Sequence, residues 1–464
     1  MIKAQQQIKD GRAARAVILA CIGLFAFAFV GSLVWTTEWP SVERLRPVGT
    51  PAGKTRPSNE NPGIRTMDDG SDSPETVRFL LDRVKRDPDD FLVQNMVASA
   101  MLLRVRETGN ADYLERAKSA AAMSLATVPP ERNPGGLSAR ARAEMAEHDF
   151  VKAREDGLHL TKIHPEELNS WGVLTDALLE LGAYEKAAAA IQEMRKLGSD
   201  TAETEIRIGR LLFLEGDTEE AKKHLFRALA FTRNIPVPPR ETTGWCLWQL
   251  GEMAFSTGDY TTAERYYREA LDTYPGYPQA LASLGRVRAA HGDLPSAIQA
   301  YEEAVRRFPD PTFVAALGDL YHLAGREREA QIQYALVEQI GHLNALNGTR
   351  YNRQLAVFYS DHNLKTEEAY EDAVREYQER RDIYGADTLA WTALKAGKLA
   401  EAQQAIGEAL RLSTQDARLL YHAGMIAAAN GNRQLSRDYL KQSLALCPKF
   451  DPLQAPIASK ALAE

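Results

Sequence analysis

The chain has 464 residues, of which 44% are hydrophobic and 26% are charged. This length exceeds what one compact core accommodates, so either several domains or a stacked array of small units is expected. Lys and Arg number 56 against 63 Asp and Glu, and the formal net charge of −7 gives no general attraction to nucleic-acid phosphates. The three cysteines, Cys21, Cys246 and Cys447, are widely separated, which argues against a disulfide framework and against a zinc site.

The first segment of distinct composition is residues 16–37, which contains no charged residue. About 20 apolar residues in a helix span a hydrocarbon core of roughly 30 Å. Lys and Arg residues precede the segment, and Trp35 and Trp39 stand where interfacial aromatic residues occur. We therefore predict one transmembrane helix at 16–37, a cytoplasmic tail at 1–15, and the rest of the chain on the far side of the membrane.

Two other interpretations of this segment stay open. Residues 26–28, Ala-Phe-Ala, match the small-residue pattern of a signal-peptide cleavage site, although the apolar run continues beyond them. Residues 18–21, which end in Cys21, faintly resemble a lipoprotein box, but few apolar residues precede the cysteine. The length of the apolar run favours the membrane anchor.

Residues 38–74 are rich in Pro, Gly, Ser and Asn and show no apolar periodicity. Such a segment buries too little apolar surface to order itself, so we predict a disordered linker that separates the following domain from the bilayer. Residues 49–55 imitate a phosphate-binding loop, but they are one residue short of the motif and contain Pro51. We expect no nucleotide at this position.

From residue 75 to 452, nearly every segment has the periodicity of an α-helix, and the helices come in pairs. In one well-defined pair, Leu247 and Leu250 share a face of the first helix, and Gly258 ends that helix. Asp259 is placed to cap a second helix, which Pro275 ends. The pattern predicts a helical hairpin at 244–275.

The residues that mark this hairpin recur further along the chain at one fixed spacing, which we call the repeat interval. Gly258, Ala263, Tyr267, Ala270 and Pro275 correspond to Gly292, Ala297, Tyr301, Ala304 and Pro309. One hairpin cannot bury its apolar face alone, so equivalent faces must meet along a stack. The spacing resembles the tetratricopeptide repeat, a helix-turn-helix unit of about 34 residues.

This resemblance implies an all-α fold, a right-handed superhelical solenoid of helix-turn-helix units preceded by one transmembrane helix. Weaker copies flank the central three, which gives about nine or ten units over residues 75–452. Residues 349–384 look like a copy with a one-residue insertion near 366–369, and residues 453–464 are expected to form a short capping helix. Such solenoids offer a concave surface, which implies binding of a peptide segment or a partner protein.

In proteins of this kind, positions 2, 5, 9, 12 and 13 of the first helix of each unit face the groove. Transferred to this sequence, they predict the partner-binding residues Asp176, Ile206, Arg210, Phe213, Trp245, Trp248, Glu252, Phe255, Arg286, Asp319, His322, Arg350 and Arg353. Aromatic rings beside charges of both signs suit an extended peptide. Trp245 and Trp248 could instead pack against the irregular connection at 234–240, and both interpretations stay open.

One subclass of this family clamps the terminal carboxylate of chaperones with Asn and Lys at groove positions. The equivalent positions here are Gln249, Ser256, Ser283, Ala290, Ala316 and Leu323. This departure argues against a chaperone-tail receptor.

The nine histidines show no metal-ligand spacing, and no Ser, His and Asp arrangement suggests an exposed nucleophile. We therefore expect no enzyme activity, no cofactor or metal, no small-molecule substrate and no nucleic-acid partner. The sequence predicts a membrane-anchored scaffold of the bacterial inner membrane, with periplasmic repeats that bind proteins or peptides to assemble or organise an envelope complex. Two alternatives stay open: a permanent structural subunit of a membrane complex, and an accessory module that presents substrate to a separate enzyme.

Overall fold

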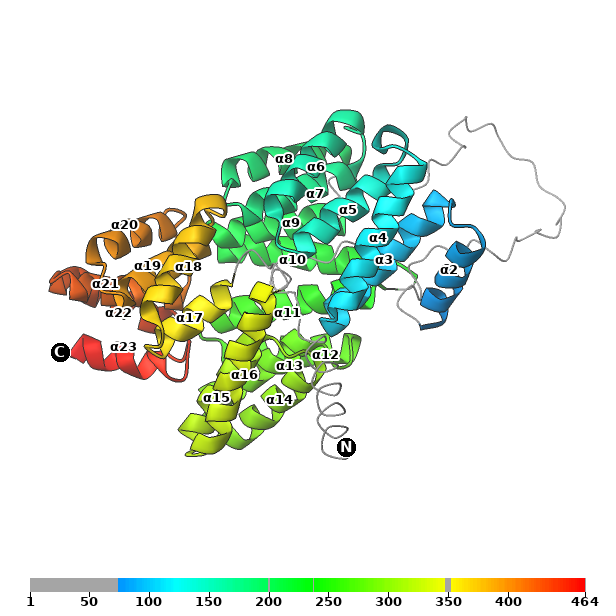
Figure 1. Cartoon of the computed structure of the whole chain (residues 1–464). Helices are drawn as coiled ribbons and strands as arrows, with labels where there is room; N and C mark the ends of the chain where they lie inside the picture. Colours follow the sequence, from blue (N-terminus) through cyan, green and yellow to red (C-terminus); the bar gives the residue numbers. More distant parts are fainter. Residues whose placement is uncertain (1–73, 199–200, 237, 347–351, 464) are drawn as a thin grey trace, which may run out of the picture.

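A computed structural model describes residues 74–198, 201–236, 238–346 and 352–463 of the chain. Within these ranges the chain forms 22 α-helices, one short 3-10 helix and no β-strand, so the fold is an all-α helical-repeat solenoid (Figure 1). The predicted tail, the predicted transmembrane helix and the linker as far as residue 73 lie outside the described residues. Among the helices that are described, none has the length and apolar character needed to cross a membrane.

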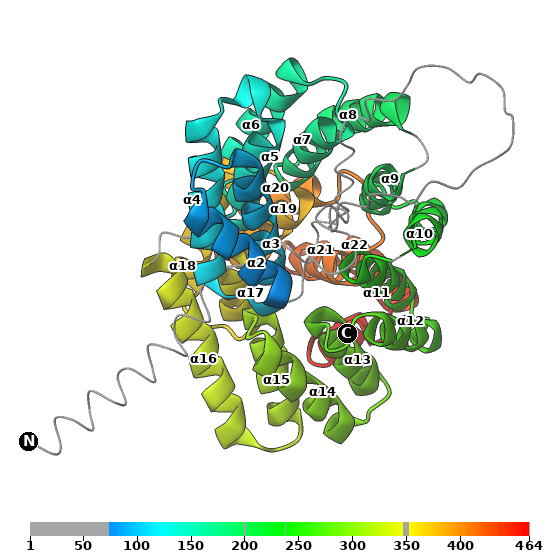
Figure 2. The same ribbon diagram turned by 90° about the vertical axis from the view of Figure 1, so that its right-hand side faces the viewer.

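Twenty of these helices pair into ten hairpins, each with an inner and an outer helix (Figure 2). The inner helices are α3 (Phe91–Thr108), α5 (Pro134–Ala146), α7 (Leu168–Glu180), α9 (Ala202–Leu214), α11 (Arg240–Ser256), α13 (Pro278–Ala290), α15 (Pro311–Leu323), α17 (Arg353–Asp361), α19 (Ile383–Lys395) and α21 (Ala417–Ala429). The outer helices are α4 (Ala111–Thr127), α6 (Phe150–Ile163), α8 (Tyr184–Leu197), α10 (Thr218–Arg233), α12 (Tyr260–Thr273), α14 (Leu294–Arg307), α16 (Glu327–Leu346), α18 (Thr366–Glu379), α20 (Leu399–Ala409) and α22 (Arg433–Leu446). The remaining elements are α2 (Pro74–Arg86), the 3-10 helix η1 (Pro130–Arg132) and α23 (Gln454–Ala463).

The inner and outer helices differ in how they are buried, and the difference follows from their sequences. In α12 the buried side chains are Ala263, Tyr267 and Ala270, which form one stripe that faces α11. Helix α11 is buried on nearly all sides, because it contacts its own outer helix and the hairpins before and after it. The inner helices therefore form the continuous core of the stack.

The turn of the hairpin at 244–275 has the structure that the sequence predicted. Gly258 has a φ of 76°, and the side chain of Asp259 accepts a hydrogen bond from the Thr262 backbone N–H at 3.0 Å. The eighth hairpin is irregular, because both Asn363 and Lys365 have positive φ and α18 begins only at Thr366. The extra residue thus lies just before the 366–369 segment where the insertion was predicted.

The stack curves until it returns on itself, as the view in Figure 2 shows. Turns that follow four inner helices lie against connections that come several hairpins later in the chain. We call these contacts the seam: Gly109 meets Phe308, Gly182 meets Arg381 and Asp382, Gly216 meets Ser413, and Gly258 meets Leu446 and Pro448. The superhelix is therefore closed, with one turn packed directly on the next.

Hydrogen bonds cross the seam at three places. The backbone N–H of Ile383 donates to the Tyr184 hydroxyl at 2.9 Å, and that of Lys449 donates to the Tyr260 hydroxyl at 2.9 Å. Between them, the Thr414 hydroxyl donates to the backbone carbonyl of Leu214. These bonds satisfy backbone groups that would otherwise lose water where the two turns meet.

Glycine permits the close approach of the two turns. A Cβ on Gly182 would overlap the backbone carbonyl of Arg381, and a Cβ on Gly216 would lie 2.5 Å from the carbonyl oxygen of Ser413. Both glycines also have positive φ, which side chains disfavour. The seam therefore requires glycine at these turns for two independent reasons.

Replacing Gly182 with Ala should lower the urea midpoint of unfolding more than replacing Gly292 with Ala. Both positions have positive φ, so each substitution costs about 1–2 kcal/mol of backbone strain. Only the Cβ at 182 meets the seam, because a Cβ at 292 has no described atom within 4 Å apart from Gly292 and its two chain neighbours. Circular dichroism measures the unfolding of both variants. Equal urea midpoints for the two variants would contradict a tightly packed seam.

Candidate partner-binding face

The middle positions of the inner helices carry charges that alternate in sign along the stack. The series is Arg142, Asp176, Arg210, Glu252, Arg286 and Asp319, on α5, α7, α9, α11, α13 and α15. Arg142 was not among the predicted residues, although it precedes Asp176 by one repeat interval. Since each charge has an opposite charge on the next inner helix, this face is largely neutral in sum.

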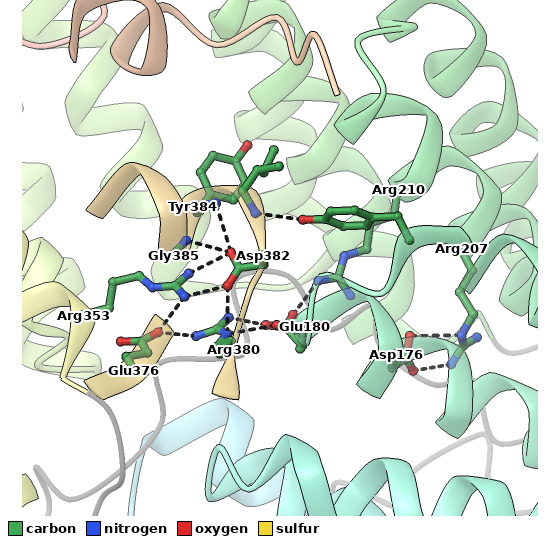
Figure 3. A network of polar contacts seen from close by, with 12 residues as sticks. Asp176, Glu180, Arg207, Arg210, Arg353, Glu376, Arg380, Asp382, Tyr384 and Gly385 are labelled. Atoms are coloured by element: carbon green, nitrogen blue, oxygen red, sulfur yellow. Dashed lines mark hydrogen bonds and ion pairs between the residues drawn. The ribbon is translucent and has the colours of Figure 1, made fainter. Parts of the chain in front are cut away.

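Asp176 on α7 forms a buried, bidentate ion pair with Arg207 on α9 (Figure 3). The Arg207 Nε atom donates to Oδ1 at 3.0 Å, and its Nη2 atom donates to Oδ2 at 2.6 Å. The Nη1 atom of Arg207 donates to the backbone carbonyl of Glu203 at 3.0 Å. This pair joins two successive hairpins and leaves little of either side chain in contact with solvent.

Glu180, at the end of α7, joins the two turns of the superhelix. Its carboxylate accepts a hydrogen bond from Arg210 at 2.5 Å, and on the other side it pairs with Arg380 from the second turn (Figure 3). The Nε atom of Arg380 also donates to the backbone carbonyl of Glu180 at 3.2 Å. Because the Glu180 side chain is only 3% exposed, this carboxylate depends on both arginines for its stabilisation.

The network continues on the second turn through Asp382, the residue that caps α19. Arg353 donates to both carboxylate oxygens of Asp382, at 3.0 and 2.6 Å, and forms a second ion pair with Glu376 at 2.6 Å. Burial by itself would raise the pKa of Asp382, but the guanidinium groups of Arg353 and Arg380 outweigh burial and hold the pKa below its usual range. The network therefore contains three carboxylates and three guanidinium groups, and it acts as a buried clasp between the turns.

A second cluster surrounds Glu252 on α11. Its carboxylate accepts hydrogen bonds from Arg286 at 2.6 and 2.7 Å, from the Tyr267 hydroxyl at 2.7 Å, and from the Ser283 hydroxyl at 2.8 Å. The Trp248 indole N–H donates to the same Ser283 hydroxyl at 2.9 Å. The cluster leaves Arg286 as its accessible member, with 31% of the side chain exposed.

The aromatic residues of this region pack against one another within the stack. The Arg286 guanidinium lies 4.0 Å from the centre of the Phe255 ring, and the Trp248 ring meets Tyr277 edge to face at 6.3 Å. Trp245 is 3% exposed and Trp248 is 6% exposed. Both indoles thus form part of the core around α11 and α13, and their described contacts are with that core.

Trp245 also lines a narrow slot where the end of α3 meets the start of α11 and the start of α13. The residues that line this slot are Arg106, Glu107, Glu241, Trp245, Tyr274, Tyr277 and Gln279. Arg106 joins the two sides, because it donates to both oxygens of Glu241 at 2.8 and 3.1 Å. Gln279 was not predicted, although it follows Trp245 by one repeat interval.

The remaining predicted residues lie in different surroundings. Asp319 accepts a hydrogen bond from the Tyr334 hydroxyl at 2.8 Å and pairs with His362 at 2.9 Å. His322 pairs with Glu327 at 2.8 Å and is more than half exposed. Ile206 is buried in the core, and Phe213 packs against that core. Arg350 lies outside the described residues.

The structure thus divides the predicted set into buried and accessible members. All five of the charged residues Asp176, Arg210, Arg353, Arg286 and His322 form ion pairs within the chain. Those of the first three are buried, whereas the side chains of Arg286 and His322 keep part of their surface exposed. In the described parts of the chain, no three His, Cys, Asp or Glu side chains converge as a metal site requires. The contacts that the structure shows on this face are hydrogen bonds, charge pairs and aromatic packing.

These features define the class: an all-α helical-repeat protein. Models of the tetratricopeptide repeat match residues 200–276, 254–320 and 388–449. The TPR repeat-containing protein YpiA of Bacillus subtilis (strain 168) is 25% identical over 299 residues, which cover 60% of this chain and 67% of that protein. The chain therefore contains tetratricopeptide repeats.

Solved structures with a similar arrangement of helices share little sequence with this chain. The human IFIT1 dimer with PPP-AAAA is 15% identical, with a TM-score of 0.44 over 82% of this chain and 95% of that chain. PilW, a widely conserved type IV pilus biogenesis factor, is 19% identical, with a TM-score of 0.37 over 48% of this chain and 96% of that chain.

Replacing Glu180 with Gln should destabilise the protein by about 3–5 kcal/mol, because the substitution breaks a buried ion network and leaves excess positive charge at the seam. The matched control is Glu303→Gln on α14, where Glu303 pairs with the half-exposed Arg307 at 2.6 Å. Loss of that surface pair should cost no more than about 0.5 kcal/mol. Urea unfolding, monitored by tryptophan fluorescence, measures the stability of both variants. A similar loss of stability in the two variants would contradict the clasp.

Proposed function

We propose that the protein is a membrane-anchored tetratricopeptide scaffold that binds other proteins or peptide segments to assemble or organise an envelope complex. In this proposal, residues 16–37 anchor the chain in the bacterial inner membrane, residues 1–15 are cytoplasmic, and residues 38–74 hold the repeats away from the bilayer in the periplasm. The apolar run at 16–37 supports the anchor. The proposal assigns the chain no reaction of its own.

The observation that carries the proposal is the inner face of the repeats. It combines aromatic rings with charges of both signs, and Arg286 and His322 extend that chemistry to accessible surface. Arginine and aromatic residues dominate the binding energy of many protein interfaces. A partner segment with mixed charge and some apolar residues would match this face.

The balance of charge supports a protein partner over a polyanion. Nucleic-acid binding requires a basic surface that neutralises successive phosphates. On the inner face each arginine of the alternating series is accompanied by an acidic residue on the next helix, and the chain as a whole is acidic. An electrostatic surface of this kind favours specific pairing of charges over general attraction.

A photo-crosslinking amino acid at His322, on inner helix α15, should capture a reproducible partner protein in intact cells. The same amino acid at Ile332 is the control, since Ile332 is 56% exposed but belongs to the outer helix α16. We expect an adduct of defined mass from position 322 that is at least several-fold stronger than from position 332. Mass spectrometry of the adduct identifies the partner.

The outcome also separates the scaffold from the alternatives. A partner that exchanges supports the scaffold, whereas co-purification at fixed stoichiometry indicates a permanent structural subunit. An accessory role for an enzyme would appear as altered turnover of the captured enzyme without a defect in its assembly. The absence of any position-specific adduct under several growth conditions would contradict the proposal.

Alkaline phosphatase fused after Glu464 should be active in cells, because its disulfides form in the oxidising periplasm. Deletion of residues 16–37 should abolish that activity and release the fusion protein from the membrane fraction. N-terminal sequencing of the mature protein tests the cleavage alternative at residues 26–28 directly. An inactive but stable full-length fusion would contradict the proposed orientation.

A further inference from the structure

His362 follows the last residue of α17 and connects the eighth hairpin to the seventh. Its Nε2 atom lies 2.9 Å from the Oδ1 atom of Asp319, and its Nδ1 atom lies 2.8 Å from the backbone carbonyl oxygen of Phe358. Asp319 belongs to α15 of the seventh hairpin, whereas Phe358 belongs to α17 itself (Figure 1). The side chain of His362 is only 16% exposed, so this connection between two hairpins is mostly buried.

The surroundings of the two ring nitrogens favour the imidazolium form of His362. A carboxylate oxygen and a carbonyl oxygen only accept hydrogen bonds, so both bonds form only when each nitrogen carries a proton. The position at the C-terminal end of α17 acts in the same direction, because the helix dipole favours a cation there. The rings of Phe358 and Tyr334 pack against the imidazole, with centres 4.5 and 4.8 Å away.

The elements around His362 carry several acidic groups. The Asp319 carboxylate also accepts a hydrogen bond from the Tyr334 hydroxyl at 2.8 Å. The charged and titratable side chains on these elements include Asp319 of α15, Tyr334 and Glu338 of α16, Asp361 of α17, and Lys365 of the following turn, which pairs with Glu338 at 2.8 Å.

These groups shift the protonation of His362 toward the cation. Burial by itself would lower the pKa of His362, but the hydrogen bond and the charge of Asp319 outweigh it, with help from the Phe358 carbonyl and the charge of Asp361. The pKa of His362 is therefore raised above its ordinary value of about 6.5.

The residue before His362 ties the same end of α17 to the hairpins that follow. Asp361 accepts a hydrogen bond from the Trp391 indole N–H of α19 at 2.9 Å and lies 3.7 Å from the Arg418 guanidinium of α21. The end of α17 is thus held from both sides, by His362 toward the seventh hairpin and by Asp361 toward the ninth and tenth. Connections among these last hairpins form the later side of the seam.

We propose that His362 is a pH-sensitive latch between hairpins one to seven and hairpins eight to ten, an inference that does not rest on the proposed function. As an imidazolium, His362 donates to Asp319 and to the Phe358 carbonyl and holds the end of α17 in place. Loss of one proton in alkaline solution removes one of these bonds. It also removes the positive charge beside Asp319, so the junction weakens and the inner face gains one negative charge.

The latch stabilises the protein at low pH more than at high pH. The folded state binds the second proton of His362 more tightly than the unfolded chain does, because the pKa is raised on folding. The stabilisation is therefore fully present below about pH 6.5, the ordinary pKa of histidine, and is lost as the pH rises through the pKa of the folded state.

The direct test is a pH titration of the full-length protein in detergent micelles, monitored by NMR of histidines labelled with ¹³C at Cε1. The variant His362→Gln assigns the signal, and His362→Asn replaces it if the Gln variant does not fold. The midpoint for His362 in the wild-type protein should lie above about 6.5. Asp319→Asn should lower this midpoint, because it removes the carboxylate that favours the cation. A wild-type midpoint at or below about 6.5 would overturn the proposal.

Urea unfolding from about pH 6 to about pH 9, monitored by circular dichroism, tests the effect on stability. His362→Gln keeps a single N–H donor group but carries no charge, so its urea midpoint should lie below that of the wild type at the acidic end. The difference should shrink as the pH rises. The matched control is His322→Gln, because His322 also pairs with a carboxylate but is 54% exposed, and the urea midpoint of this variant should stay close to that of the wild type throughout.

The pH profile separates a latch from a purely structural contact. A difference between the wild type and His362→Gln that is the same at every pH would give His362 a structural role alone and would overturn the latch. The wild-type titration needs no variant except for assignment, so it decides the matter even if Asp319→Asn does not fold.

Discussion

The structure depends on the close packing of one turn of the superhelix on the next. A stack of helical hairpins buries apolar surface between neighbours, and by itself it could remain an open coil. Here glycines at the turns allow backbone to meet backbone, and the clasp of Glu180, Arg380 and Asp382 supplies charge pairs at the same place. The result is a closed solenoid in which hairpins that are far apart in the sequence are direct neighbours.

Closure adds contacts to charges that neighbouring hairpins already pair. Several charges of the inner helices pair with the neighbouring hairpin, as Asp176 does with Arg207. Arg210 and Arg353 are paired in the same local way, with Glu180 and Asp382, and closure adds Arg380 from the second turn to Glu180. Closure also brings α3 beside α11, where Arg106 donates hydrogen bonds to Glu241.

The sequence predicted much of the repeat architecture because the relevant forces are local. Gly258 ends an inner helix and Asp259 caps the next through contacts between near neighbours in the chain, so their identities suffice to locate the turn. The packing of Ala263, Tyr267 and Ala270 against the neighbouring helix follows from one stripe of the helix. Each of these contacts recurs at the repeat interval, and this recurrence makes the repeat recognisable in the sequence.

Residues whose partners lie outside the repeat interval could not be predicted in the same way. For Trp245 and Trp248 the sequence left both the groove and the core open, and the burial of Trp248 is decided by Tyr277 and Ser283 of the following hairpin. Glu180 and Arg380 carry no periodic signal, since their contact joins two turns of a superhelix whose curvature is set by small rotations summed over many units. The sequence by itself determined the hairpins and their order, because short-range burial and capping specify them. The tertiary structure alone decided where the coil closes and which residues meet across the seam, such as Glu180 and Arg380, because those contacts arise only after all the small rotations have accumulated.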